Sequence, residues 1–311
     1  MGRIIKWHLL SRQGRGVALV LFPLLLSACG QDEPAPYAPE YSQHPVNGEK
    51  TYIFGVHPLH NPQRLEETYG PIVEYLNRHL SEETLRLEAS RSYEEYDKKL
   101  YARHFHFALP NPYQTINSLK HGYRVFGKMG EDHHFRGIIL VRKDSGINKI
   151  SDLRGKSVSF PAPTALAATM MPLYLLHSAG LNTERDFKKL FSGSQESAIM
   201  NVYLRKSAAG ATWPPPWEAF QSRHPEFAAH LTVRWETPPL VNNGLVARDD
   251  VPEELRIRVG ELLFSLHESP EGRRLLRALP LKEFEPATGE TYKPVLEFMR
   301  VYEETVLKDR K

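Results

Sequence analysis

Short strand-like runs alternate with amphipathic helix-like segments between residues 51 and 266, and this alternation constrains the fold more than any other feature of the chain. The runs with strand character lie at 51–57, 84–90, 105–110, 136–144, 156–160 and from 244 onward. Strands that alternate with helices in this way predict an α/β fold with largely parallel sheets. No internal repeat interrupts the pattern.

Capping residues predict where several helices begin. Asn61 followed by Pro62 is an N-cap and first-turn pair for a helix whose apolar stripe continues to Leu80. Pro71 lies inside that stripe and is expected to break or kink the helix. Thr164 is expected to cap a helix in the stretch SFPAPTALAATMMP, residues 159–172. A helix that starts directly after a strand offers free N–H groups to an anion.

The N-terminal segment has the pattern of an export signal. Four basic residues precede an apolar run over 17–28, which is shorter than the roughly 20 residues that a membrane span needs. The run ends in Leu-Ser-Ala-Cys, which resembles the lipobox of bacterial lipoproteins and predicts lipidation of Cys29. The alternative is a free thiol after a plain signal peptide. We expect a lipoprotein signal peptide at 1–28, a proline-rich tether at 29–49 and a membrane-anchored protein outside the cytoplasm.

The charge and cysteine content exclude several classes of protein. Of the 40 Lys and Arg residues, four precede Cys29, which leaves 36 against 37 acidic residues in the exported part. This balance does not indicate a nucleic-acid partner. Cys29 is the single cysteine, so no disulfide can form within the chain. The chain carries no Gly-x-Ser-x-Gly, phosphate-loop or paired-carboxylate motif, and we expect neither enzymatic activity nor a cofactor.

A set of motifs in a fixed order resembles one family. The motifs are GVHPLHNPQRLEETYGPIVEYLNRHL, SYEEYDKKL, FALPNPYQTI, RGIILVRKDSGINKISDLRGKSVSF, FSGSQESAIMNVYL and LVARDDVPEELRIRV. Together they resemble the phosphonate-binding-protein-like family of periplasmic substrate-binding proteins, which deliver phosphate, phosphite or phosphonate to ABC importers. The resemblance covers roughly residues 50–305.

The resemblance implies a type II periplasmic-binding-protein fold with two α/β lobes joined by two hinge strands. The first lobe would comprise 50–142 and 244–311, and the second would comprise 143–243. A small-molecule ligand would bind between the lobes, and the partner of the monomeric protein would be an ABC permease. The same lobe closure could instead signal to a membrane sensor kinase, and the sequence leaves that alternative open.

Loops at the predicted cleft supply the candidate ligand contacts. They are His57 and His60 after the first strand, Asn111 and Tyr113 after the third, Thr164 and Ala165 in the 159–172 stretch, Ser194 and Gln195 at a further helix start, and Trp213 beside a triple proline. The family typically carries Ser-Thr-Ser where this chain has Ala165, Leu166 and Ala167, and often histidine in place of Gln195. Each lost hydrogen bond to a charged group is worth on the order of 1.5–3 kcal/mol. We therefore expect a ligand that is less charged or more apolar than a phosphonate, with a cleft that no longer binds a ligand as the alternative.

Two further histidine groups could in principle bind a metal ion. His104 and His106 alternate along a predicted strand and so share a face, and His133 and His134 are adjacent. Neither group has a third ligand that the sequence identifies, and no metal site is predicted.

Overall fold

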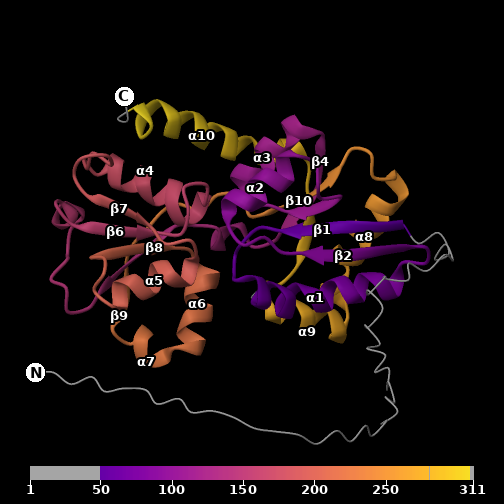
Figure 1. Cartoon of the computed structure of the whole chain (residues 1–311), viewed down its shortest axis with the longest axis horizontal. Coiled ribbons are helices and arrows are strands. Elements are labelled where there is room, and N and C mark those ends of the chain that lie inside the picture. The colour runs from indigo at the N-terminus through magenta and orange to yellow at the C-terminus, as the bar shows by residue number, and fades with distance from the viewer. Residues whose placement is uncertain (1–49, 280, 309–311) are drawn as a thin grey trace, which may run out of the picture. The chain divides into compact units, whose positions relative to one another are not determined.

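The computed structural model describes residues 50–279 and 281–308, and it contains two sheets flanked by helices (Figure 1). The predicted signal peptide, the tether and Cys29 lie outside the described residues. Within the described part, no helix combines the length and the hydrophobicity that a membrane span requires.

The first sheet has six strands in the order β11-β4-β10-β3-β1-β2. Its strands are β1 Lys50–Val56, β2 Glu83–Glu88, β3 Phe107–Leu109, β4 Tyr123–Met129, β10 Gly244–Arg248 and β11 Phe284–Pro286. β1 pairs in parallel with β2 and β3, whereas β10 is antiparallel to β3 and β4, and β11 is antiparallel to β4. The strands β1 to β4 therefore share one direction, and β10 and β11 oppose them.

The second sheet has five strands in the order β7-β6-β8-β5-β9. Its strands are β5 Ile138–Arg142, β6 Ser157–Phe160, β7 Lys188–Phe191, β8 Ala209–Thr212 and β9 Leu231–Glu236. β6 pairs in parallel with β7 and β8, and β5 is antiparallel to β8 and β9. Only β5 among these described strands runs against the rest. The expectation of largely parallel sheets is met in part, because both sheets also contain antiparallel pairs.

The position of β5 corrects one expectation. A first lobe that extends to residue 142 would contain this strand, but all of its pairing partners belong to the second sheet. Residues 138–141 are buried and apolar, and they need neighbours on both edges. The chain therefore crosses from the first sheet to the second at 130–137, before the strand. It returns at 237–243, between β9 and β10.

Helices cover both faces of each sheet (Figure 1). The α-helices are α1 Pro62–His79, α2 Tyr93–Tyr101, α3 Pro112–Ser118, α4 Met171–Ser178, α5 Gln195–Tyr203, α6 Pro214–Arg223, α7 Pro225–Ala228, α8 Glu253–Phe264, α9 Pro270–Ala278 and α10 Lys293–Thr305. Short 3-10 turns lie at Leu119–His121, Asp132–His134, Ile150–Leu153, Leu266–Glu268 and Gly289–Tyr292. The last helix, α10, contacts both α3 and α4, so it packs on elements attached to different sheets.

The first helix begins as expected but does not break. The Asn61 side chain accepts a hydrogen bond from the Arg64 N–H at 2.9 Å, which confirms the N-cap. Pro71 does not break the helix, because α1 continues to His79, and the alternative of a kink stays a prediction. Leu65 and Leu76, on either side of the proline, are both fully buried. Packing of this apolar stripe stabilises the helix beyond its intrinsic propensity.

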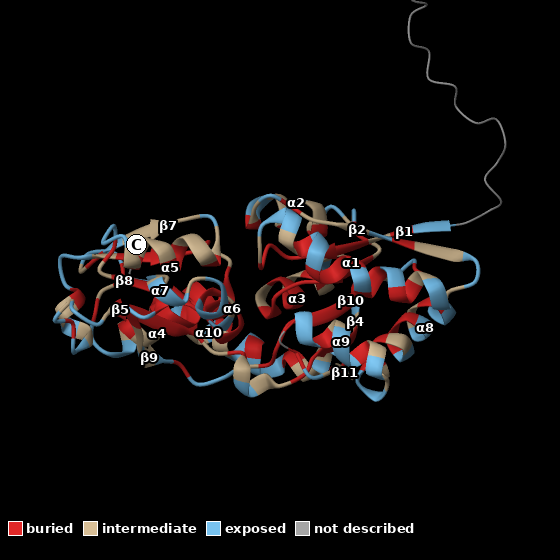
Figure 2. Cartoon of the chain, turned by 90° about the horizontal axis from the view of Figure 1, so that it is seen from below, coloured by how far each residue is buried: buried red, intermediate tan, exposed pale blue. Residues whose placement is uncertain are grey.

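Buried residues gather along the strands and on the helix faces that pack against them (Figure 2). One apolar cluster joins residues of both sheets, from Phe54 and Phe107 in the first to Val158 and Phe160 in the second. The two sheets therefore share a continuous core.

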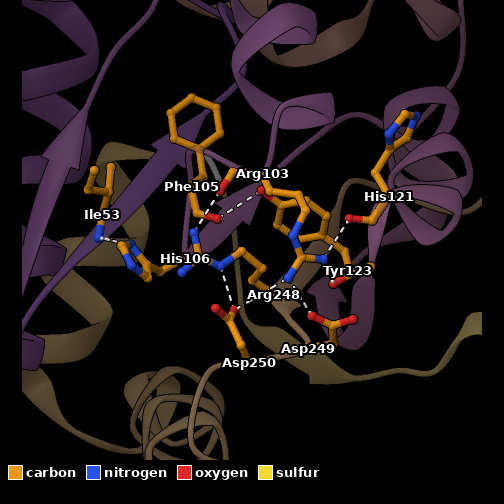
Figure 3. A network of polar contacts seen from close by, with 10 residues as sticks. Ile53, Arg103, Phe105, His106, His121, Tyr123, Arg248, Asp249 and Asp250 are labelled. Carbon is orange, nitrogen blue, oxygen red and sulfur yellow. Dashed lines mark hydrogen bonds and ion pairs between the residues drawn. The ribbon is translucent and has the colours of Figure 1, made fainter.

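A polar network fastens one end of the first sheet (Figure 3). Arg103 donates to the Asp249 carboxylate at 2.6 Å and to the carbonyls of His121 and Gly122. Arg248 pairs with Asp250 and donates to the Arg103 carbonyl at 2.7 Å. These contacts join the start of β4 to the end of β10, two strand ends that are more than 100 residues apart in the sequence.

The histidines near this network have separate roles. His106 accepts a hydrogen bond from the Ile53 N–H at 2.9 Å, whereas His104 bonds the Glu88 carboxylate at 2.8 Å. Their partners come from two different strands, β1 and β2, so the two rings do not form a common site.

Substitution at Gly137 tests how tightly the first crossing segment packs. A Cβ atom there would lie 2.5 Å from the Ala167 carbonyl oxygen and 2.8 Å from the Pro172 ring. We expect Gly137→Ala to lower the free energy of unfolding by about 1–3 kcal/mol, because backbone atoms cannot move aside cheaply. Urea denaturation followed by circular dichroism measures this change. Gly289→Ala is the matched control, since its nearest described atom would be 3.7 Å away. Equal stability of both variants would contradict the close packing.

Candidate functional site

The stretch 159–172 forms an unusual helix start rather than a standard one. Leu166–Met170 is a π-helical turn that leads directly into α4, and Pro172 lies in the first turn of that helix. The Met170 N–H donates to the Ala165 carbonyl at 3.3 Å, which is the i→i+5 spacing of a π-turn. The N-cap is Ala165, which has no side-chain acceptor. The prediction that Thr164 caps this helix is therefore wrong.

Thr164 fails as a cap because its polar groups are used elsewhere. Its carbonyl accepts a hydrogen bond from Asn111 Nδ2 at 3.0 Å, and its side chain hydrogen-bonds the Asp97 carboxyl. Asp97 also accepts from Gln114 Nε2 at 2.6 Å. Burial raises the pKa of Asp97 to about 6, and these hydrogen bonds oppose the rise.

A small cavity lies where the π-turn meets loops from the first sheet. It is lined by His57, Tyr93, Asn111, Phe135, Ala165, Leu166, Ala167, Ala168, Gln195, Trp213 and Asn243. Its volume is about 10 Å³, close to the space that one water molecule needs. The first N–H groups of the turn have no acceptor within their own helix and supply backbone donors at this wall.

The side chain of His57 lines the cavity, and its imidazole ring is neutral. It is 2% exposed, and its Nδ1 lies 2.9 Å from the Leu109 carbonyl oxygen. Since a carbonyl can only accept, Nδ1 carries the proton and Nε2 keeps its lone pair. Burial lowers the pKa of His57 to about 4, and the bond to the carbonyl opposes that shift. The ring is therefore an uncharged acceptor at neutral pH.

A chain of hydrogen bonds crosses the cavity between the two sheets. Gln195 Nε2 donates to the Tyr93 hydroxyl at 3.3 Å, and Thr212 Oγ1 donates to Gln195 Oε1 at 2.8 Å. Tyr93 lies on α2, after a strand of the first sheet, whereas Gln195 begins α5 and Thr212 ends β8 in the second. The Tyr93 ring packs with Ala162, Ala165 and Ala168. Small apolar side chains at the π-turn thus provide the surface on which this tyrosine rests.

Asn243 adds an acceptor that the sequence did not indicate. The residue is fully buried just before β10, and its Oδ1 has no hydrogen-bond partner among the described residues. Its Nδ2 lies 3.3 Å from the Met129 sulfur. Burying an unsatisfied carbonyl oxygen costs about 1–3 kcal/mol, and a ligand donor in the cavity would recover it.

A larger pocket of about 400 Å³ adjoins the small cavity through Gln195, which lines both. Its other lining residues are Leu59, His60, Asn61, Ser194, Glu196, Ser197, Met200, Pro216 and Arg223. Burial, and then the positive charge of Arg64 and Arg223, lowers the pKa of His60 to about 3. Glu196 is paired with Arg223 at 3.0 Å. The pocket is therefore polar but internally charge-balanced.

The structure brings together most of the predicted contact residues. His57, Asn111, Ala165, Gln195 and Trp213 line the small cavity, and His60, Ser194 and again Gln195 line the larger pocket. Ser194 Oγ also accepts from the Ser197 N–H at 3.1 Å as the N-cap of α5. Tyr113 and Thr164 line neither cavity, and a ligand contact by either stays a prediction.

The sequence did not indicate three residues that line the small cavity, which are Tyr93, Phe135 and Asn243. Tyr93 directly follows the N-cap Ser92, a position that a search for residues at helix starts would have found. Phe135 lies in the first crossing segment and packs on Trp213 with ring centroids 5.4 Å apart. No local pattern marks Phe135 or Asn243.

Comparison with known families identifies the chain. The family of periplasmic substrate-binding proteins of phosphonate ABC transporters matches residues 54–292. The chain belongs to this family. The chain is similar to a probable ABC transporter phosphite binding protein of Prochlorococcus marinus, 26% identical over 200 residues, which are 60% of this chain and 66% of the relative. The phosphonates-binding periplasmic protein of Escherichia coli is 20% identical over 162 residues, 51% of this chain and 48% of that protein. The chain thus spans less than two thirds of either relative.

Solved structures in this family have the same fold. A binding protein component of an ABC phosphonate transporter from Pseudomonas aeruginosa matches with a TM-score of 0.77 and 15% identity, over 84% of this chain and 89% of that one. The Prochlorococcus protein in complex with methylphosphonate gives 0.74 and 20% identity, over 81% and 98%. The two-lobed α/β fold expected from the sequence is confirmed.

The buried His57 ring predicts a pH-dependent loss of stability. Its pKa is near 6.5 in the unfolded chain and about 4 in the folded one, so the unfolded state binds the proton first as the pH falls. The stabilisation is complete above pH 6.5 and is lost toward pH 4, by on the order of 3 kcal/mol. Asp97, whose pKa is raised, acts in the opposite direction over part of this window.

A comparison of variants isolates the contribution of His57. We expect urea denaturation at several pH values to show a smaller loss for His57→Gln than for the wild type. His230→Gln is the control, because this exposed histidine lies away from both cavities. Parallel pH profiles for the wild type and His57→Gln would rule out a neutral buried ring.

Proposed function

We propose that this protein is the extracytoplasmic ligand-binding component of an ABC importer and that its ligand binds at the small cavity between the two sheets. The family assignment and the meeting of five predicted contact residues at one cavity support this proposal. The helices and loops attached to each sheet would move as one lobe, with 130–137 and 237–243 as the hinges. No catalytic role is proposed.

The lining of the cavity favours an uncharged polar ligand over a phosphonate. No lysine, arginine, aspartate or glutamate lines it in the described part of the chain. His57 is neutral there, and methyl groups replace the hydroxyls at Ala165 and Ala167. A doubly charged headgroup would lose its hydration without gaining a compensating charge. The backbone donors of the π-turn and the acceptors of His57 and Asn243 suit a neutral molecule with both donors and acceptors.

Ligand entry requires the cavity to open. A space of about 10 Å³ holds no organic ligand, and the Tyr93–Gln195 and Asn111–Thr164 hydrogen bonds close it directly. In the open state these four residues would expose their polar groups. A ligand that binds between the lobes would replace the two direct bonds by bonds to itself and shift the population toward a closed form.

Calorimetry with oxyanions tests the proposed ligand class. We expect methylphosphonate, phosphite and phosphate to bind the purified full chain weakly or not at all. The residues Ala165, Leu166 and Ala167 offer no hydroxyl donors, and no lysine or arginine lines the cavity in the described part of the chain. The Prochlorococcus protein, whose structure contains methylphosphonate, is the positive control. A sub-micromolar dissociation constant for any of the three anions would refute the proposal. A thermal-shift screen of small uncharged polar compounds provides the complementary search, since a ligand at 100 times its dissociation constant stabilises by about 2.7 kcal/mol.

The membrane anchor is a separate part of the proposal, and it rests on the sequence around Cys29 alone. We expect Cys29→Ser to release the protein from the membrane fraction of a bacterial host, because the thiol is the proposed acceptor of the lipid. Ser27→Ala is the matched control, since it keeps a small residue in the lipobox-like stretch and should leave the protein in the membranes. An unchanged membrane fraction for Cys29→Ser would contradict lipidation. The sensor role stays an alternative prediction with less support, because the matching family consists of transporter components.

A further inference from the structure

The first crossing segment contains a cluster of metal-ligating side chains. Glu131, His133 and His134 each offer a ligand atom, and these three atoms lie within 4.8 Å of one another. The sequence singles out the adjacent histidines but supplies no third ligand. The turn Asp132–His134 brings Glu131 to the same side, through a hydrogen bond from the His134 N–H to the Glu131 carbonyl at 2.8 Å.

We propose that Glu131, His133 and His134 form a binding site for a divalent transition-metal ion of the zinc class. Two imidazole nitrogens and one carboxylate oxygen are a donor set that suits Zn²⁺, with a fourth position open to water. Imidazole ligands favour zinc, copper and nickel over calcium and magnesium. Within the described residues, neither imidazole ring has a hydrogen-bond partner, so both retain their donor atoms for a metal.

Glu131 is held in the position that a ligand needs. Its side chain is about one-tenth exposed, and its Oε2 accepts a hydrogen bond from the Lys282 N–H at 3.0 Å. Oε1 is buried and makes no hydrogen bond among the described residues. The backbone of Glu131 has φ 60° and ψ 52°, the left-handed region that costs a side-chain-bearing residue of order 1–3 kcal/mol. Such strain persists where the surrounding structure fixes it, and it often occurs at ligand sites.

The Lys282 ammonium group would compete with a metal ion for the Glu131 carboxylate. Its ammonium nitrogen lies 3.2 Å from Glu131 Oε1, but its side chain is 80% exposed on a flexible stem. A metal ion would displace this ammonium into solvent, where the exposed lysine side chain can be fully hydrated. Removing the lysine charge should therefore tighten metal binding, which a merely structural cluster would not show.

Calorimetric titration of the untagged, chelator-treated full chain with ZnCl₂ tests the site, with Co²⁺ absorption as a spectroscopic readout of the ligand set. We expect one saturable site. Glu131→Gln and the double variant His133→Ala/His134→Ala should each weaken binding at least tenfold, since loss of even an outer-shell partner costs about 10–100-fold. Lys282→Gln should strengthen binding. His104→Ala is the matched control, because this histidine already bonds Glu88, and it should leave the affinity unchanged.

Four results of these titrations would contradict the proposed metal site. The absence of a stoichiometric site, unchanged affinity in the Glu131 and histidine variants, or an equal loss in His104→Ala would each overturn the proposal. Weaker binding in Lys282→Gln would also contradict it, because the ammonium would then support the site rather than compete. Circular dichroism of every variant guards against unfolding as the cause of a loss. Neither result depends on the identity of the transported ligand.

Discussion

Two crossing segments, 130–137 and 237–243, connect the sheets, and hydrogen bonds join the two segments to each other. Leu240 N–H donates to the Phe135 carbonyl at 2.9 Å, and Gly137 and Thr237 exchange bonds in both directions. Asn242 donates to the Asp132 carboxylate and to the Gly130 carbonyl. The segments are thus fixed to each other side by side, and the facing loops of the two lobes are joined by the Tyr93–Gln195 and Asn111–Thr164 bonds. In the proposed binding protein, these paired segments would serve together as the hinge.

One wall of the cavity is the π-turn Leu166–Met170, whose side chains are mostly small and apolar. The π-turn keeps the position and the free backbone donors of an anion-binding helix start, but its side chains are small and apolar. Tyr93 packs on those alanines and meets Gln195 from the opposite lobe. The alanines at the turn therefore provide the surface on which Tyr93 packs, and the proposed loss of oxyanion affinity rests on the same side chains.

Local signals predicted the local structure well. The Asn61 cap, the α1 stripe and the strands β1, β2, β3, β5, β6 and β10 all follow from residues within a few positions of one another. Prediction failed where distant contacts decide. β4, with the mixed sequence YRVFGKM, is a strand because β10 and β11 pair with its two edges. Pro71 is tolerated because both flanking turns of α1 are buried, and Thr164 fails as a cap because Asn111 and Asp97 engage it.

By itself the sequence determined the α/β class, the family resemblance, most helix starts and five of the residues that line the cavity. Capping, periodicity and loop position act over short stretches, so a single chain can display them. Only the tertiary structure decided that β5 belongs to the second sheet, that Tyr93 and Asn243 face the cavity, and that Glu131 joins His133 and His134. The first two depend on pairings between segments tens to hundreds of residues apart, whose free energy comes from packing and hydrogen bonds that no local pattern encodes. The third depends on the backbone conformation of the turn after Glu131, which the sequence did not indicate.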